Sequence, residues 1–301
     1  MESPTPVIQI ENLDYSYGKE EAVHNLSLRV MPGRCYGLFG RNGAGKTTTM
    51  KCLLNLLRPQ RGQVRVFGLD PAKDEVEVKC RLAYVPDQVA FYPWMSVRET
   101  LDYLASFRGH WNRKKEQELF DRFQLDPAKR AGALSKGQRT QLALIAAICP
   151  ETDLLVLDEP TSGLDPIVRR EFIETVIGAY QEGNLGNRTI LVSTHLITEF
   201  EGLIDDFTII DRGVSVLTLE ADEARERYQR IRARFAEALP ELDFRAALHV
   251  RREGRELELI VNGTGPELLE RLRQHAPEAL STEALTLEEI FVAALKSSEA
   301  R

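Results

Sequence analysis

The sequence predicts an α/β fold: a parallel sheet, a small antiparallel β layer before it, a helical insertion, and a small α+β domain at the C-terminal end. Three short, β-rich apolar runs, at residues 35–39, 154–157 and 189–193, are typical of parallel strands covered on both faces. A long stretch with apolar residues at helical spacing separates the first run from the other two. Beyond residue 219 the sequence changes to charged helix-like and strand-like segments.

The antiparallel layer is predicted from period-2 patterning. Between Leu26 and Val30 every second residue is apolar, and the segment from Val7 to Tyr17 is interpreted in the same way, as a half-buried strand. The helical insertion is placed at about residues 90–150, where Leu101 and Leu104 belong to one apolar helix face. We therefore expect a first domain at residues 1–218 and an accessory α+β domain at residues 219–301.

Composition limits the function classes. The longest apolar run, residues 142–149, is about eight residues, whereas a helix needs roughly 20 to span a bilayer. The N-terminus has neither the basic start nor the apolar core of a secretion signal, so we expect a cytoplasmic protein. The net charge of −7 argues against nucleic acid as a partner. The four cysteines (Cys35, Cys52, Cys80 and Cys149) have no C-x-x-C spacing and are interpreted as reduced core residues.

A phosphate-binding P-loop, G-x-x-x-x-G-K-[ST], follows the first buried run and precedes a predicted helix over residues 48–57. Its residues are Gly40, Arg41, Asn42, Gly43, Ala44, Gly45, Lys46 and Thr47. Glycines let the backbone curl so that its N–H groups, with the positive end of the helix, bind phosphate. Lys46 adds a charge to the phosphates, and the Thr47 hydroxyl can ligate Mg²⁺.

Two adjacent carboxylates, Asp158 and Glu159, end the apolar run at 154–157. On a parallel sheet they emerge at the same edge as the P-loop. Asp158 then suits a Mg²⁺-holding role, and Glu159 can polarise a water for attack on a γ-phosphate. Taken alone, such a pair is more often a helix cap or a solvated turn, and the P-loop reverses that preference.

Leu134, Ser135, Lys136, Gly137 and Gln138 precede a helix expected to begin near Arg139, with Ser135 as its cap. Alone, this pentapeptide is explained by a capped helix. It also resembles LSGGQ, the signature of ATP-binding cassette (ABC) proteins, with Lys136 in place of a glycine. The P-loop, this signature, LLVLDEP and the SGLD of residues 162–165 follow the order and spacing of that family. Over about residues 7–218 the chain therefore resembles an ABC ATPase, a P-loop NTPase.

The resemblance implies individual roles. Tyr17 would stack on adenine, Gly40 to Thr48 would wrap the triphosphate of ATP, and Glu159 would be the general base. His195 corresponds to the switch histidine that contacts the γ-phosphate, and Asp165 to the loop that communicates across a dimer. One position departs from the family, which usually has glutamine after a Tyr-Val-Pro strand end. Here Asp87 follows, then Gln88, so either Asp87 contacts metal or water, which we favour, or Gln88 does so after a one-residue shift.

The large side chains of Phe91, Tyr92, Trp94 and Met95 surround Pro93. They are compatible with core packing and equally with an exposed groove that docks a partner. The resemblance implies that a helix of the membrane subunit is seated there.

One P-loop and one separate signature in each chain are explained by two copies, arranged head to tail around two ATP. The resemblance implies a homodimer, or a dimer with a similar ATPase, attached to an integral membrane permease at the inner face of the cell membrane. The segment LTLEEIF at 285–291 is similar to the tails of exporter ATPases. The alternative is a soluble ABC ATPase that acts on nucleic acid or the ribosome; the acidic balance and the single cassette argue against it.

Overall fold

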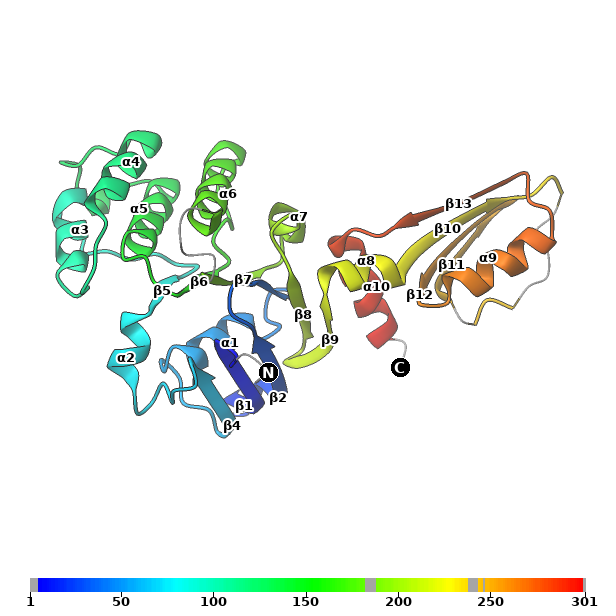
Figure 1. The fold of residues 1–301 in the computed structure, drawn as a ribbon, viewed down its shortest axis with the longest axis horizontal. Helices are drawn as coiled ribbons and strands as arrows, with labels where there is room; N and C mark the ends of the chain where they lie inside the picture. The colour runs from blue at the N-terminus through cyan, green and yellow to red at the C-terminus, as the bar shows by residue number, and fades with distance from the viewer. Residues whose placement is uncertain (1–4, 182–187, 238–242, 246, 300–301) are drawn as a thin grey trace. The chain divides into compact units, whose positions relative to one another are not determined.

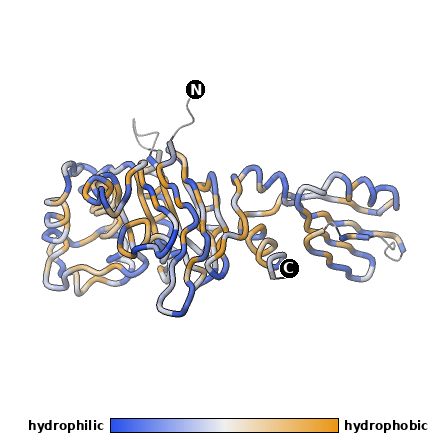
Figure 2. The backbone as a smooth tube through the Cα atoms, turned by 90° about the horizontal axis from the view of Figure 1, so that it is seen from below, coloured by the Kyte–Doolittle hydropathy of each residue, from blue (hydrophilic) through white to orange (hydrophobic). Residues whose placement is uncertain are grey.

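The computed structural model describes residues 5–181, 188–237, 243–245 and 247–299. The chain divides into two compact units, Met1–Ser215 and Val216–Arg301 (Figure 1). In the first unit the strands are mostly coloured as hydrophobic and the outer loops as hydrophilic (Figure 2). None of the helices among the described residues combines the length and the apolar character that crossing a membrane requires.

The centre of the first unit is formed by five parallel strands of a six-stranded sheet in the order β5-β6-β7-β3-β8-β9; the sixth strand, β9, begins in this unit and continues past its end at Ser215. The three predicted apolar runs are β3, β6 and β7, and every residue of these strands is buried. The six strands are β3 (Cys35–Phe39), β5 (Leu82–Val85), β6 (Leu154–Asp158), β7 (Thr189–Thr194), β8 (Asp206–Asp211) and β9 (Val214–Glu220).

The predicted antiparallel layer is present, with the order β2-β1-β4. It consists of β1 (Ile8–Tyr17), β2 (Glu20–Val30) and β4 (Arg61–Val66). The register pairs Ile8 with Val30 on one side and with Val66 on the other, which places all three in one apolar face. These residues belong to a core that also holds Leu38 and Met50, so the layer and the parallel sheet share one hydrophobic interior.

The predicted helical insertion contains α3 (Val97–Ala105), α4 (Arg113–Phe123) and α5 (Lys136–Ile148). Glu116 of α4 is buried there, and its carboxylate accepts hydrogen bonds from Arg98, Trp111 and Arg113. The remaining helices of this unit are α1 (Lys46–Leu53), α2 (Glu75–Cys80), α6 (Pro166–Gln181) and α7 (Ile197–Phe200). The prediction for α1 was wrong at both ends, because the helix begins within the P-loop motif and its last turn loosens before residue 57.

The second unit is α+β, as predicted. Its antiparallel sheet has the order β11-β12-β10-β13, and Leu268 and Leu272 of α9 pack against buried residues of β10 and β12. The elements are α8 (Ala221–Arg227), β10 (Tyr228–Arg234), β11 (Ala247–Glu253), β12 (Glu256–Asn262), α9 (Gly265–Gln274), β13 (Ala279–Ala284) and α10 (Leu287–Glu299).

Candidate nucleotide-binding site

The P-loop connects β3 to α1, and two of its glycines are required by close packing. A Cβ at Gly45 would lie 2.4 Å from the carbonyl oxygen of Ala22, and the residue has φ +105°. A Cβ at Gly40 would lie 2.6 Å from the carbonyl oxygen of Ile210. Both distances are far below van der Waals contact, so only glycine lets the loop curl this tightly at the start of the helix.

Lys46, the first residue of α1, is buried, and its Nζ lies inside the loop. Nζ donates hydrogen bonds to the carbonyl oxygens of Gly40 at 2.7 Å and Arg41 at 3.2 Å. It also lies 2.8 Å from Oε1 of Glu159, and the side chains of Lys46 and Glu159 are only 5% and 10% exposed. The ammonium group is therefore held where a phosphate would bind, with a carboxylate as its present counterion.

Asp158, the last residue of β6, is fully buried, and each carboxylate oxygen has a hydroxyl donor. Oδ1 accepts from Ser193 Oγ at 2.5 Å and from Thr47 Oγ1 at 3.1 Å, and Oδ2 accepts from Tyr84 OH at 3.4 Å. Burial raises the pKa of Asp158 above its ordinary value, while the hydrogen bonds from Ser193 and Thr47 lower it. The neighbouring charges of Glu159 and Asp87 raise it further.

Glu159 follows directly and adopts φ +46°, a left-handed conformation that turns its carboxylate toward the P-loop. Its backbone N–H donates to the carbonyl oxygen of Ser193 at 3.0 Å. Oε2 lies 2.8 Å from Nδ1 of His195, the residue after β7. The structure thus places Lys46 and His195 on either oxygen of the Glu159 carboxylate. This carboxylate can accept a proton from a water bound beside a phosphate.

Of the two candidates after β5, Asp87 is half-buried and Gln88 is exposed. Asp87 lies near enough to Asp158 for its charge to contribute to the pKa of that carboxyl, and it also contributes to the raised pKa of Tyr84. Sequence reasoning missed Tyr84 and Ser193 as partners of Asp158. The signal was the strand order, because Ser193 pairs with Asp158 across β6 and β7, and Tyr84 lies on the other neighbouring strand.

The donor set near the P-loop fits Mg²⁺. This ion keeps several waters and is usually held by one or two carboxylates together with phosphate oxygens. The Thr47 hydroxyl, Asp158 and Asp87 supply such a set. Within the described ranges no group of three or more His, Cys, Asp or Glu residues could hold a metal alone, so the phosphates would complete the coordination.

The signature segment lies at the N-terminus of α5. Ser135 caps the helix, as predicted: its Oγ accepts from the N–H of Gln138 at 3.2 Å, and its own N–H donates to Gln138 Oε1. The helix begins at Lys136, three residues before the predicted start. Nζ of Lys136 lies 2.9 Å from where a Cβ of Gly163 would be, and Gly137 faces Val168. Leu134, just before the cap, is buried.

Asp165 directly precedes α6, and its Oδ1 accepts hydrogen bonds from the backbone N–H groups of Ile167 and Val168. For the part of the chain that the structure describes, no hydrogen bond or ion pair joins residues 134–138 to residues 40–48. The signature is thus placed beside the loop before α6 and not on its own P-loop.

Tyr17 is 47% exposed, with its ring edge-on to Tyr15 at 4.9 Å between centroids.

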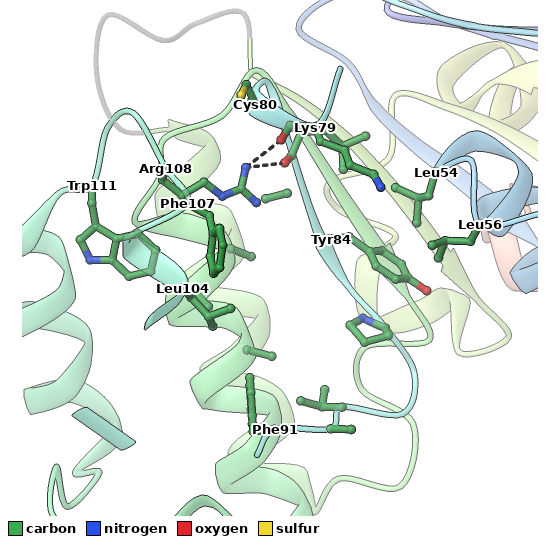
Figure 3. A pocket seen from close by; sticks show the side chains of 18 of the residues that line it. Leu54, Leu56, Lys79, Cys80, Tyr84, Phe91, Leu104, Phe107, Arg108 and Trp111 are labelled. Carbon is green, nitrogen blue, oxygen red and sulfur yellow. Dashed lines mark hydrogen bonds between the residues drawn. The ribbon is translucent and has the colours of Figure 1, made fainter. Parts of the chain in front are cut away.

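Of the two interpretations of the aromatic cluster, core packing is wrong for Tyr92 and Trp94. Their side chains are 48% and 60% exposed, and their ring centroids lie 4.9 Å apart. The backbone of this segment is held to residues 131 and 132, whose N–H groups donate to the carbonyl oxygens of Met95 and Pro93. Phe91 is half-buried and lines a groove of about 610 Å³ between the sheet and the helical insertion (Figure 3). Met95 is half-buried as well.

Cys80 also lines this groove and is exposed, so its interpretation as a core residue was wrong. The cause is local: α2 is a single short surface helix in which only Val78 is buried. Cys35, Cys52 and Cys149 are buried free thiols, as predicted.

Comparison with known proteins gives the family. A profile described as "ABC transporter" matches residues 23–162. The bacitracin transport ATP-binding protein BcrA of Bacillus licheniformis is 33% identical over 223 residues, which cover 73% of this chain and 72% of that protein. The chain belongs to the ABC transporter family. The Nod factor export ATP-binding protein I of Cupriavidus metallidurans is 34% identical over 214 residues, which cover 69% of this chain and 69% of that protein.

Among solved structures, the ATP-binding subunit of an ABC transporter superposes with a TM-score of 0.66 at 26% identity, over 73% of this chain and 92% of that one. The protein is therefore an ABC transporter ATP-binding subunit and an ATPase. In this ABC subunit the residues around Glu159 occupy the edge of the sheet at which α/β proteins bind their ligands.

Proposed function

We propose that this ABC subunit hydrolyses Mg²⁺-ATP between two copies of itself and so drives export through a separate membrane permease. The observation that carries the proposal is the arrangement at one edge of the sheet. Lys46 and Thr47 of the P-loop, Asp158 and Glu159 of β6 and His195 after β7 are linked there by contacts of 2.8–3.1 Å or by adjacency in the chain.

In this proposal the phosphates of ATP replace Glu159 as the ion-pair partner of Lys46. The freed carboxylate of Glu159 then accepts a proton from the attacking water, and His195, held at 2.8 Å, orients that carboxylate and contacts the γ-phosphate. Thr47, Asp158 and Asp87 would hold Mg²⁺, which neutralises charge on the phosphates. Tyr17 would stack on adenine through its exposed ring.

A second copy is proposed to complete each site. Ser135, Lys136 and Gly137 project from the N-terminus of α5 without bonding to their own P-loop, and a helix N-terminus favours an anion. In a head-to-tail pair they would face the partner's ATP, so that loss of the γ-phosphate weakens the interface. We take residues 1–218 as the ATPase domain and 219–301 as an accessory domain.

Export and the permease are inferred from relatives and from the groove. The relatives are named for bacitracin transport and for Nod factor export, and we extend the direction of transport, though not the substrate, to this chain. The groove that Phe91 lines, with Tyr92 and Trp94 exposed beside it, would receive a helix of the permease at the inner face of the membrane. A role in nucleic-acid or ribosome biology is not favoured by these relatives.

Two variants test the proposal in the purified chain. Lys46→Ala should lose ATP binding in calorimetry. Glu159→Gln should bind ATP, stop hydrolysis, and elute as a dimer from gel filtration only when ATP and Mg²⁺ are present. Glu253→Gln, an exposed change on β11, is the control and should behave as wild type. Normal hydrolysis by Glu159→Gln would refute its assignment as the base, and a monomer under all conditions would refute the two-copy site.

A further inference from the structure

One side chain, that of Tyr84, belongs both to the groove and to the nucleotide site. It stands on β5, next to β6 in the sheet, with Val156 as its register partner. Its ring lines the groove, where Figure 3 shows it among Leu54, Phe107 and Arg108. Its hydroxyl donates to Oδ2 of Asp158 at 3.4 Å. The phenol ring thus spans the distance between an open surface and a fully buried carboxylate.

We propose that Tyr84 is a positioning residue that couples occupancy of the groove to the orientation of Asp158, and thereby to Mg²⁺-nucleotide binding. The inference rests on the proposed function, because it assigns Asp158 to the metal. It adds a specific mechanical link: an occupant that presses on the ring moves the hydroxyl, and the hydroxyl turns the carboxylate.

The partners of Asp158 make this link effective. Ser193 and Thr47 both donate to Oδ1, whereas Tyr84 is the hydroxyl donor to Oδ2. The carboxylate can therefore rotate about its Oδ1 side when the Tyr84 contact changes. At 3.4 Å that contact is longer than a usual O–H···O hydrogen bond, so a shift of a few tenths of an ångström decides how strong it is.

The groove contains a natural labelling site, the thiol of Cys80. Cys80 lines it and is exposed, while the other three cysteines are buried. Burial raises the pKa of Cys52 to about 11 and of Cys149 to about 12, and it also raises that of Cys35, so few of these thiols are in the reactive thiolate form. A bulky maleimide should therefore modify Cys80 selectively and place a defined group in the groove that Tyr84 also lines.

The experiment measures binding of a fluorescent ATP analogue to the full chain, with and without pyrenyl maleimide on Cys80, in Mg²⁺ and in EDTA. In wild type, modification should change the Mg²⁺-dependent affinity about fivefold, the lower end of usual coupling between sites, and leave the affinity in EDTA unchanged. Tyr84→Phe keeps the ring and removes the hydroxyl, so its modified and unmodified forms should bind alike. Tyr103→Phe, the same deletion on an exposed ring of α3, should keep the wild-type response.

An equal response in wild type and Tyr84→Phe would overturn the proposal, as would a wild-type response that persists in EDTA or is absent altogether. If Tyr84→Phe does not fold, wild type alone decides through reciprocity: a non-hydrolysable ATP analogue should change the rate of Cys80 modification with Mg²⁺ and not with EDTA. Failure of unmodified wild type to bind the analogue at all would instead refute the proposed nucleotide function.

Discussion

Replacing Glu159 by glutamine tests whether this carboxylate competes with nucleotide for Lys46. The substitution keeps the shape of the side chain and removes its charge. In the structure the carboxylate lies 2.8 Å from Lys46 Nζ, with both side chains at least nine-tenths buried. A hydrogen bond to a charged partner contributes about 1.5–3 kcal/mol and a neutral one about 0.5–1.5 kcal/mol. The competing interaction should therefore weaken by about 1 kcal/mol, which corresponds to roughly fivefold tighter phosphate binding.

The assay is calorimetric titration with ADP, which avoids coupling to dimer formation through the γ-phosphate. Glu159→Gln should bind ADP about fivefold more tightly than wild type, while its ATP turnover falls by at least about 10²-fold through loss of the base. The control is Glu199→Gln, because Glu199 is held by Arg169 and Thr161 and not by Lys46. Equal ADP affinity in wild type and Glu159→Gln would show that the ion pair does not oppose nucleotide, and would refute the reasoning.

Three further outcomes follow from other sites. Tyr17→Ala should weaken ATP binding by about 1–3 kcal/mol in calorimetry, the usual value of a base stacked on an aromatic ring, and Tyr17→Phe should not. Asp158→Asn should raise the melting temperature of the nucleotide-free protein at neutral pH. Because burial raises the pKa of Asp158, its charged form costs stability above that pKa, and the advantage of asparagine should shrink as the pH falls through it, which melts across pH will check. Glu116→Ala should lower the free energy of unfolding in urea by about 2 kcal/mol, less than for a fully buried pair, because Arg98 and Arg113 are more than a third exposed.

The sequence was sufficient for those features that short segments determine. The apolar runs of β3, β6 and β7 have no alternative to burial, and the P-loop is recognised from eight consecutive residues, so both could be predicted locally. The cap at Ser135 was likewise visible from a pattern four residues long. The start of α5 was missed by three residues because Gly137, in the first turn after the cap, is a poor helix former.

The contacts between distant segments could not be predicted in this way. Tyr84 and Asp158 are 74 residues apart and meet only because β5 and β6 are neighbours in the sheet. The same holds for the pair of Lys46 and Glu159, which depends on the conformation of Glu159 at positive φ. For Tyr92, composition left core and surface equally compatible; in the fold its ring is exposed and contacts Trp94 and Tyr103, a neighbour that the local pattern does not reveal.

Lys136, which stands where the LSGGQ signature has a glycine, has its side chain beside the loop that follows Glu159. The loop that follows Glu159 passes Thr161, whose hydroxyl donates to Glu199 at 2.5 Å, and reaches Gly163 beneath the Lys136 ammonium group. Three residues, 160–162, therefore lie between the proposed base and Gly163, which neighbours Lys136 of the signature segment in the same chain. In the proposed pair that segment faces the partner's ATP, so a movement of Glu159 on loss of phosphate in one site would be transmitted to the cation beside the other. A lysine in place of glycine adds positive charge there, which should strengthen attraction to the partner's phosphates rather than disturb the interface.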